Sequence, residues 1–156
     1  MNNEQVEILL VEDNRDDLEL AMHALRKENL ANHIQVARDG EEALDFLFCT
    51  GPHTARSFER PPKLVLLDLK LPKVDGLEVL RRMKSDPRTR AIPVVILTSS
   101  KEERDLTRGY GLGANSYIQK SVDFHQFQET VKIAGLYWLL INQPAPVAAA
   151  KAASKS

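Results

Sequence analysis

Polar residues able to do chemistry stand where the apolar, strand-length segments of this sequence end. Glu12 and Asp13 close the first such segment, Asp68 closes the third, Thr98 the fourth and Lys120 the fifth. A carboxylate at the end of a buried strand loses hydration unless something binds it, so Asp68 is either a local cap or part of a site. The carboxyl ends of parallel strands share one edge of a sheet, so these five residues are expected to form one cluster.

Such a cluster suits phosphoryl transfer assisted by a divalent cation. Three carboxylates within a few ångströms repel one another unless a cation neutralises them, and Mg²⁺ prefers oxygen ligands of this kind. Asp68 could then attack a phosphoryl group as a carboxylate nucleophile. Mg²⁺, the Lys120 ammonium and the Thr98 hydroxyl would each meet an oxygen of the transferred group.

The elements that must position these residues follow from the hydrophobic pattern, in which strand-length apolar segments alternate with segments of helical period. The expected strands are Val6–Val11, His33–Arg38 at an edge, Leu64–Leu67, Ile92–Leu97 and Ser116–Gln119. Helices are expected after the N-cap Asn14, after Asp39-Gly40, over Leu77–Met83, over Thr107–Gly113 and after Asp123. This alternation predicts an α/β fold: a doubly wound, five-stranded parallel sheet of flavodoxin-like order 2-1-3-4-5, with helices on both faces.

We expect one folded domain over residues 1–142, with a long C-terminal helix over 123–141, followed by a disordered tail over 143–156. The connection over 50–62 is longer than usual between a helix and a strand. It is either a solvated loop or a partner-docking segment that uses Arg56, Phe58 and Arg60.

Composition excludes several classes of protein. The 156 residues carry a formal net charge of -1, which offers no electrostatic footprint for nucleic acid or for an anionic membrane surface. The lone Cys49 excludes an intramolecular disulfide, and neither a secretion signal nor a membrane-spanning segment is apparent. We therefore expect a cytoplasmic protein that binds neither nucleic acid nor membrane.

The sequence resembles the response-regulator receiver domains of two-component signalling, over essentially all of residues 7–138. The resemblance rests on Glu12-Asp13 in LLVEDN, Asp68 in LLDLKLPKVDGLEVL, Thr98 in VVILTSS and Lys120 in SYIQKS. It implies that Asp68 is the phosphoacceptor, with Thr98 and Lys120 as its catalytic partners. It also implies that Asp13, Asp68 and the backbone carbonyl of Lys70 bind Mg²⁺, while Glu12 acts through a bound water.

The same resemblance implies a partner and a switch. The partner is a sensor histidine kinase, and the loop over 50–62, the Lys120-Ser121 pair and the aromatic last helix resemble the single-domain regulators that partner phytochrome-type kinases. Most receivers have proline where Ser121 stands. Thr98 and Tyr117 are the expected switch residues, acting on a face formed by the fourth helix, the fifth strand and the fifth helix.

Apolar residues surround the end of the last helix, and a lone globule would leave them exposed. Leu136, Tyr137, Leu139 and Leu140 widen the core-facing stripe there, which predicts a homodimer through this helix. The alternative is that the end of the helix folds back onto its own sheet.

The same residues allow other interpretations. Taken singly, Asp13, Asp68 and Thr98 could cap helices or turns. A haloacid-dehalogenase-type phosphatase uses similar groups, but it needs a second aspartate at the position where this chain has Lys70. A receiver-like interaction module that never takes phosphate would not need all five site residues. We therefore expect a regulator that is not an enzyme with an external substrate, and that no DNA-binding or enzymatic output domain follows.

Overall fold

Five parallel strands form one sheet in the order β2-β1-β3-β4-β5. The computed structural model describes residues 6–27, 33–98, 108, 110–119 and 124–137. The strands are β1 (Ile8–Val11), β2 (Ile34–Ala37), β3 (Leu64–Leu67), β4 (Val94–Thr98) and β5 (Ser116–Gln119). The predicted fold class and strand order are therefore confirmed, with the half-buried β2 at one edge.

The bounds of three strands differ from the prediction: β1 begins at Ile8 instead of Val6, β2 covers Ile34–Ala37 instead of His33–Arg38, and β4 begins and ends later than expected. The fourth strand was expected to begin at Ile92, but β4 begins at Val94. Pro93 has no backbone N–H to donate to a neighbouring strand, and its carbonyl accepts from the Val65 N–H at 3.0 Å. Pro93 can therefore accept a hydrogen bond from β3 but cannot donate one, and the regular strand begins only after it.

Four helices have described bounds: α1 (Arg15–Lys27), α2 (Gly40–Leu47), α3 (Gly76–Ser85) and α5 (Phe124–Leu136). Each of the first three begins at a side-chain cap, which satisfies a backbone donor that has no partner within the helix. Asn14 Oδ1 accepts from the Asp17 N–H at 3.0 Å, Asp39 caps α2 and Asp75 caps α3. Of the expected helix over 107–113, the structure describes only residues 108 and 110–113.

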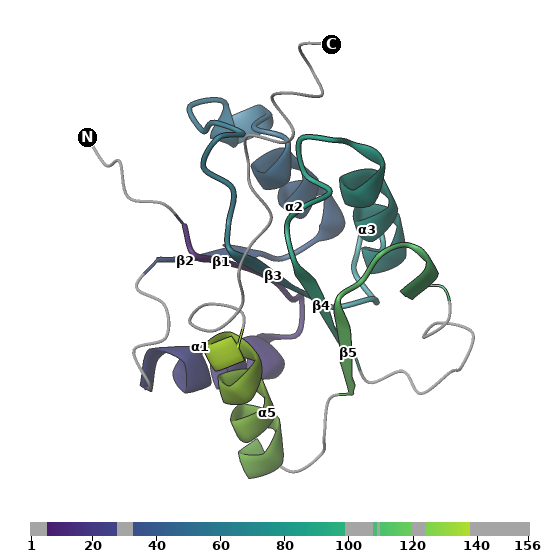
Figure 1. Cartoon of the computed structure of the whole chain (residues 1–156). Coiled ribbons are helices and arrows are strands. Elements are labelled where there is room, and N and C mark those ends of the chain that lie inside the picture. The colour runs from purple at the N-terminus through teal and green to yellow at the C-terminus, as the bar shows by residue number, and fades with distance from the viewer. Residues whose placement is uncertain (1–5, 28–32, 99–107, 109, 120–123, 138–156) are drawn as a thin grey trace.

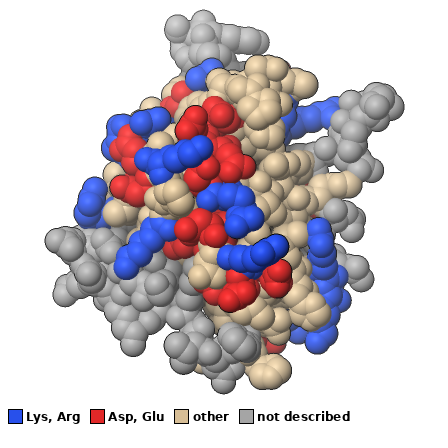
Figure 2. Space-filling view, turned by 180° about the vertical axis from the view of Figure 1, so that it is seen from behind, with Lys and Arg blue, Asp and Glu red and all other residues tan. Residues whose placement is uncertain are grey.

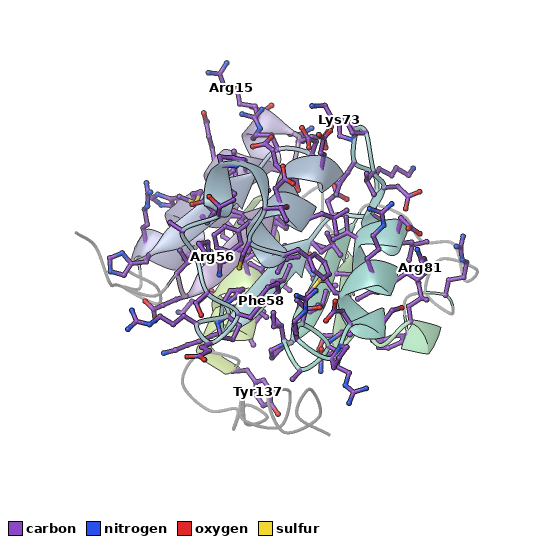
Figure 3. The ribbon with its side chains drawn as sticks, turned by 90° about the horizontal axis from the view of Figure 1, so that it is seen from above. Arg15, Arg56, Phe58, Lys73, Arg81 and Tyr137 are labelled. Atoms are coloured by element: carbon purple, nitrogen blue, oxygen red, sulfur yellow. The ribbon has the colours of Figure 1, made fainter. Side chains whose placement is uncertain are left out.

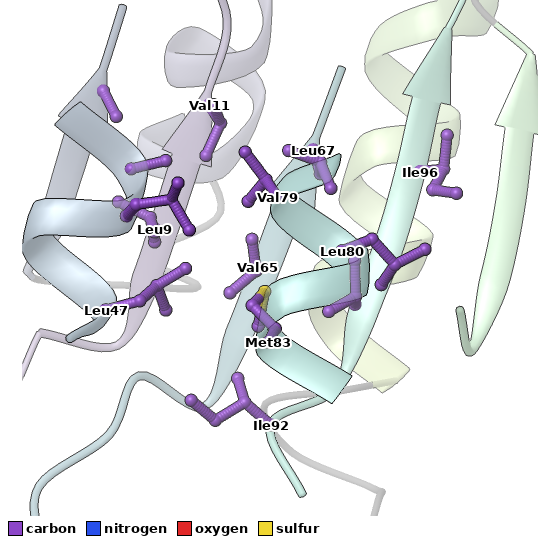
Figure 4. Packing of buried hydrophobic residues seen from close by; sticks show 14 of the residues in the cluster. Leu9, Val11, Leu47, Val65, Leu67, Val79, Leu80, Met83, Ile92 and Ile96 are labelled. Carbon is purple, nitrogen blue, oxygen red and sulfur yellow. The ribbon is translucent and has the colours of Figure 1, made fainter. Parts of the chain in front are cut away.

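The helices cover both faces of the sheet, as predicted. In Figure 1, α2 and α3 lie on one face and α1 and α5 pack together on the other. Successive strand residues point to opposite faces, so Leu9 and Val11 join the core under α2 and α3 while Ile8 and Leu10 join the core over α1 and α5. Figure 4 shows the first of these cores, in which Met83 and Leu80 of α3 lie over β3 and β4.

The connection over 50–62 packs against α2. It includes a short 3-10 turn, η1 (Gly51–His53). The Arg56 guanidinium lies 3.6 Å from the centre of the Phe46 ring and donates to the Phe46 carbonyl. The Phe58 ring meets Phe48 edge to face and lies under the Arg88 guanidinium. Figure 3 labels Arg56 and Phe58 among the side chains. Arg56 and Phe58, which were candidates for docking a partner, thus hold the connection to the domain itself.

Charged side chains of both signs are mixed on one face of the described part of the molecule. Figure 2 shows Lys and Arg interspersed with Asp and Glu over much of the face turned to the viewer. Among the described helices, none combines the length and the apolar character needed to cross a bilayer. The predicted tail over 143–156, the cap Asp123 and the last turn of the 123–141 helix lie outside the described residues.

Candidate metal and phosphoryl site

The ends of two neighbouring central strands place the carboxylates. Glu12 directly follows β1 and Asp68 directly follows β3, and these strands pair in register with Val11 opposite Leu67. Backbone hydrogen bonds fix both positions, because the Glu12 N–H donates to the Ala37 carbonyl at 3.0 Å and the Asp68 N–H donates to the Val11 carbonyl at 3.1 Å. The carboxylates therefore leave the sheet at the same edge.

Three carboxylates meet at this edge. Glu12, Asp13 and Asp68 each offer an oxygen, and these oxygens all lie within 4.8 Å of one another. Glu12 is 3% exposed and Asp68 is 6% exposed, whereas Asp13 lies more open to solvent. Buried like charges at this separation are stabilised by a cation, and an all-oxygen set suits a hard divalent ion such as Mg²⁺. The residues present therefore fit the metal that the sequence predicted.

Local hydrogen bonds orient the two buried carboxylates. The Asn14 N–H donates to Glu12 Oε2 at 3.1 Å, and the Lys70 N–H donates to Asp68 Oδ1 at 3.4 Å. Asp68 thus makes the local turn contact that was one interpretation of this residue. Because the same carboxylate also belongs to the three-carboxylate cluster, the turn contact orients the group for the cluster and does not replace that role.

An open pocket of about 530 Å³ adjoins the cluster. Its lining comes from Asp13, from the segment after β3, from the start of α3 and from Arg108. Lys70 is exposed on this lining. Of the three carboxylates, Asp13 lines this pocket, so the pocket opens beside the cluster.

The remaining predicted residues are only partly described. Thr98 ends β4 and Tyr117 lies in β5, next to β4, so their backbones are placed. Their side chains, and the whole of Lys120, lie outside the described part of the chain. Thr98 is thus at the carboxyl-end edge by its strand position, while the expected contacts of Lys120 and Tyr117 stay predictions.

Sequence reasoning missed two contributions to the site. The Arg38 guanidinium donates to the backbone carbonyl of Asp13 at 3.4 Å. Lys73, in the segment after β3, lies 3.6 Å from the Asp39 carboxylate at the start of α2. Desolvation would raise the pKa of Asp39, but the Glu42 N–H and the Lys73 ammonium outweigh it and hold this pKa below its usual value. The only signal in the sequence was the polar pair Arg38-Asp39 directly after the second strand.

A second surface feature lies between β5 and α5. A groove of about 530 Å³ is lined mainly by apolar side chains, among them Ile118 and Ala134. Ile133 and Tyr137 line it as well, although they are 58% and 46% exposed. In Figure 3, Tyr137 lies on the opposite side of the molecule from Lys73.

Comparison with known proteins agrees with this geometry. Residues 8–132 match the family model described as the response regulator receiver domain. The chain is 45% identical over 140 residues to the probable methanogenesis regulatory protein FilR2 of Methanothrix harundinacea, covering 89% of this chain and 88% of that protein.

Two solved structures superimpose over nearly the whole chain. The phosphorylated cyanobacterial phytochrome response regulator RcpA has a TM-score of 0.83 and 40% identity, covering 90% of this chain and 99% of that one. The Mn²⁺-bound form of the response regulator Rcp1 has a TM-score of 0.83 and 36% identity, covering 91% and 99%.

Proposed function

The chain belongs to the response regulator receiver domain family, and from this membership we propose that it accepts a phosphoryl group on Asp68 from a sensor histidine kinase. The observation that carries the proposal is the meeting of Glu12, Asp13 and Asp68 at the carboxyl-end edge of the sheet. RcpA, with 40% identity, is named as a phosphorylated phytochrome response regulator, which supports the same chemistry.

In the proposed reaction, an Asp68 carboxylate oxygen attacks the phosphorus of a phosphohistidine. The new O–P bond forms as the P–N bond breaks, and the electron pair leaves with the imidazole nitrogen, which takes a proton. The Lys70 N–H donates to Asp68 Oδ1 at 3.4 Å, a contact that orients the carboxylate. By the sequence prediction, the Thr98 hydroxyl and the Lys120 ammonium donate to the phosphoryl oxygens, where charge spreads in the transition state.

Glu12, Asp13 and Asp68, with the backbone carbonyl of Lys70, are proposed to hold the divalent cation, Glu12 through a water molecule. A bound Mg²⁺ would neutralise these carboxylates and polarise the phosphoryl oxygens. Rcp1, with 36% identity, is named in a Mn²⁺-bound form, which supports a divalent ion at this place. The choice of Mg²⁺ is part of the proposal.

The proposed partner is a cytoplasmic sensor histidine kinase of the phytochrome type. The name of RcpA supports this partner, whereas FilR2, at 45% identity, is named for the regulation of methanogenesis. Measuring phosphotransfer to this chain from a panel of purified kinases, among them a phytochrome kinase, tests whether the donor is of the phytochrome type. We propose no external substrate, so the chain catalyses only its own phosphorylation and dephosphorylation.

Phosphorylation is tested with acetyl phosphate and Mg²⁺, read by intact-protein mass spectrometry. Wild type should gain one acid-labile phosphoryl group, and Asp68→Asn should gain none. Asp75→Asn is the matched control, since Asp75 lines the same pocket and asparagine preserves its capping contact to the Glu78 N–H. If Asp68→Asn is labelled as wild type is, the assignment is wrong; an unlabelled wild type indicates a phosphate-independent interaction module.

We further propose that phosphorylation changes the face formed by residues 107–113, β5 and α5, through Thr98 and Tyr117, and that this face forms a homodimer. The groove between β5 and α5, with Ile133 and Tyr137 exposed on it, supports an apolar partner at this face. A second copy presents the same groove and the same exposed side chains, so the contact can close with twofold symmetry.

Sedimentation velocity at micromolar concentration, with and without phosphoryl analogue, tests the dimer. Ile133→Asp should shift wild-type dimers to monomers, because a carboxylate would be buried in the apolar contact. His125→Asp is the control, as an exposed position on the same helix. A monomeric wild type under both conditions would remove the dimer from the proposal.

A further inference from the structure

The segment after Asp68 is in contact with the start of α2, far away in the sequence. The Gly40 N–H donates to the Pro72 carbonyl at 3.3 Å. This bond joins the first residue of α2 to the segment 69–75, which also lines the pocket beside the carboxylates. A helix N-terminus has backbone donors without partners in the helix, and here one of them holds the segment.

Gly40 also allows a close approach that no other residue would permit. A Cβ built on Gly40 would overlap the carbonyl oxygen of Val74 and lie 2.6 Å from the Val74 carbonyl carbon. Real Cβ atoms do not approach backbone atoms so closely, so any side chain at position 40 would push the segment away from α2.

Charge reinforces the same contact. The Lys73 ammonium lies 3.6 Å from the Asp39 carboxylate and 3.8 Å from the Glu41 carboxylate. Asp39 is only 8% exposed, and its other oxygen caps α2 by accepting from the Glu42 N–H at 2.8 Å. Lys73 itself has a φ of 67°, a left-handed conformation that costs energy for a lysine and is held by its surroundings.

The segment is fixed at its other end by α3. The Gly76 N–H donates to the Leu69 carbonyl at 2.8 Å, and a Cβ on Gly76 would lie 2.7 Å from the Leu69 Cα. Only Lys70 and Leu71 stand between Leu69, which is held by α3, and Pro72, which is held by α2. A displacement at Val74 must therefore move the backbone next to Asp68, because the chain between the attachments is short.

We propose that Asp39, Gly40 and Lys73 are positioning residues for the divalent cation: they hold the segment 69–75 so that the backbone after Asp68 faces the three carboxylates, and thereby set the metal affinity. This inference rests on the proposed function, since it concerns the metal that assists phosphorylation. It adds a contact between α2 and the site that acts without touching the ion.

The direction in which one substitution changes the cation affinity distinguishes a positioning role from a purely electrostatic one. Lys73→Asn removes the ammonium, and asparagine tolerates the left-handed φ better than most residues. Loss of a positive charge near the carboxylates would by Coulomb attraction alone strengthen cation binding. Positioning predicts the opposite: the Kd for Mn²⁺, measured by calorimetry, should rise about tenfold, at the lower end of the range for outer-shell partners. Lys63→Asn, which removes the same charge before β3, should leave the Kd unchanged.

A second pair of variants tests the close approach. Gly40→Ala should raise the Kd for Mn²⁺ about tenfold or more and speed amide hydrogen exchange in residues 69–75. Gly111→Ala is the matched control, because a Cβ there would meet no atom within 4 Å. The thermal midpoint of each metal-free variant reports any general loss of stability, and Asp39→Asn keeps the helix cap while removing the ion pair.

The outcomes of these experiments distinguish failure of the positioning role from failure of the proposed function. An unchanged or lower Kd in Lys73→Asn, or a Gly40→Ala protein that melts earlier but binds Mn²⁺ as wild type does, overturns the positioning role. If Gly40→Ala does not fold, Lys73→Asn and Asp39→Asn decide the question. A wild type that binds no divalent cation, or that binds one equally well after Asp68→Asn, contradicts the proposed function and not this inference alone.

Discussion

At the scale of single residues, the carboxylates that would bind a metal lower the stability of the metal-free protein, because they repel one another. Glu12, Asp13 and Asp68 bring three like charges within 4.8 Å, and two of these side chains are buried. Two unit charges at such a distance repel by roughly 1 kcal/mol at the dielectric of water and by roughly 3.5 kcal/mol at the effective dielectric of a protein surface. The folded chain tolerates this repulsion because the strand ends hold the backbone in place.

Neutralising one carboxylate should therefore stabilise the metal-free protein. Asp13→Asn removes the most exposed charge of the cluster without changing the size of the side chain, and we expect the thermal midpoint in EDTA to rise by about 2–4 °C, equivalent to ~1 kcal/mol. Adding Mg²⁺ should reverse the order, since wild type gains stability by binding the ion and the variant gains little. Thermal unfolding followed by circular dichroism measures both.

Asp16→Asn serves as the control for that experiment. Asp16 is an exposed carboxylate in the first turn of α1, where a negative charge interacts favourably with the helix dipole. Its neutralisation should lower the midpoint slightly and leave the effect of Mg²⁺ intact. A lower midpoint for Asp13→Asn in EDTA would mean that hydrogen bonds of the Asp13 carboxylate outweigh the repulsion.

At the scale of elements, the connection over 50–62 depends on one guanidinium. Arg56 stacks on Phe46 and donates to the Phe46 carbonyl and, at 3.2 Å, to the Arg60 carbonyl. Arg56→Lys should cost about 1–2 kcal/mol in urea unfolding, since lysine lacks the planar fork that makes these contacts together. Arg90→Lys, at an exposed position, should be neutral within error. Equal stabilities for the two variants would show that the connection is held by its apolar contacts instead.

Element types were predictable from the sequence because period and caps are local signals. Asn14 and Asp39 mark the starts of α1 and α2, and both make the capping contacts expected of their residue types. The start of β4 was wrong by two residues, since the apolar period continues through Pro93 although proline interrupts the ladder. The fixed connection over 50–62 was not predictable, because Arg56 meets Phe46 through a fold of the chain that leaves no periodic trace.

At the scale of the whole molecule, the winding of the sheet explains why so much of the site was predictable. Glu12 and Asp68 are distant in the sequence, but once β1 and β3 are parallel neighbours their ends must meet. What the pattern could not show is how the loops at that edge pack on one another. The close contact of Gly40 with Val74 is possible because glycine has no side chain. A single sequence does not reveal which of its glycines is needed for such a contact.

The half-buried Lys84 joins the end of α3 to the segment before β4 and makes global stability sensitive to pH. Lys84 of α3 donates to the Arg90 carbonyl at 2.9 Å and to the Ile92 carbonyl at 2.7 Å, just before β4. Its aliphatic stem lies close to Gly113, on the approach to β5. Burial lowers the pKa of Lys84 to about 8, from an ordinary value of 10.5.

The sign of the resulting pH dependence follows from proton counting. Between pH 8 and 10.5 the unfolded state carries the proton on Lys84 more often than the folded state does, so the free energy of unfolding should rise with pH over this interval. Because the side chain is partly exposed, the gain is at most about 2 kcal/mol. Urea unfolding at half-unit steps of pH measures it, and Lys84→Met should flatten the rise while Lys63→Met keeps it. Parallel profiles for wild type and Lys84→Met would show that the Lys84 amine keeps its ordinary pKa in the folded protein, with its two carbonyl partners compensating for burial.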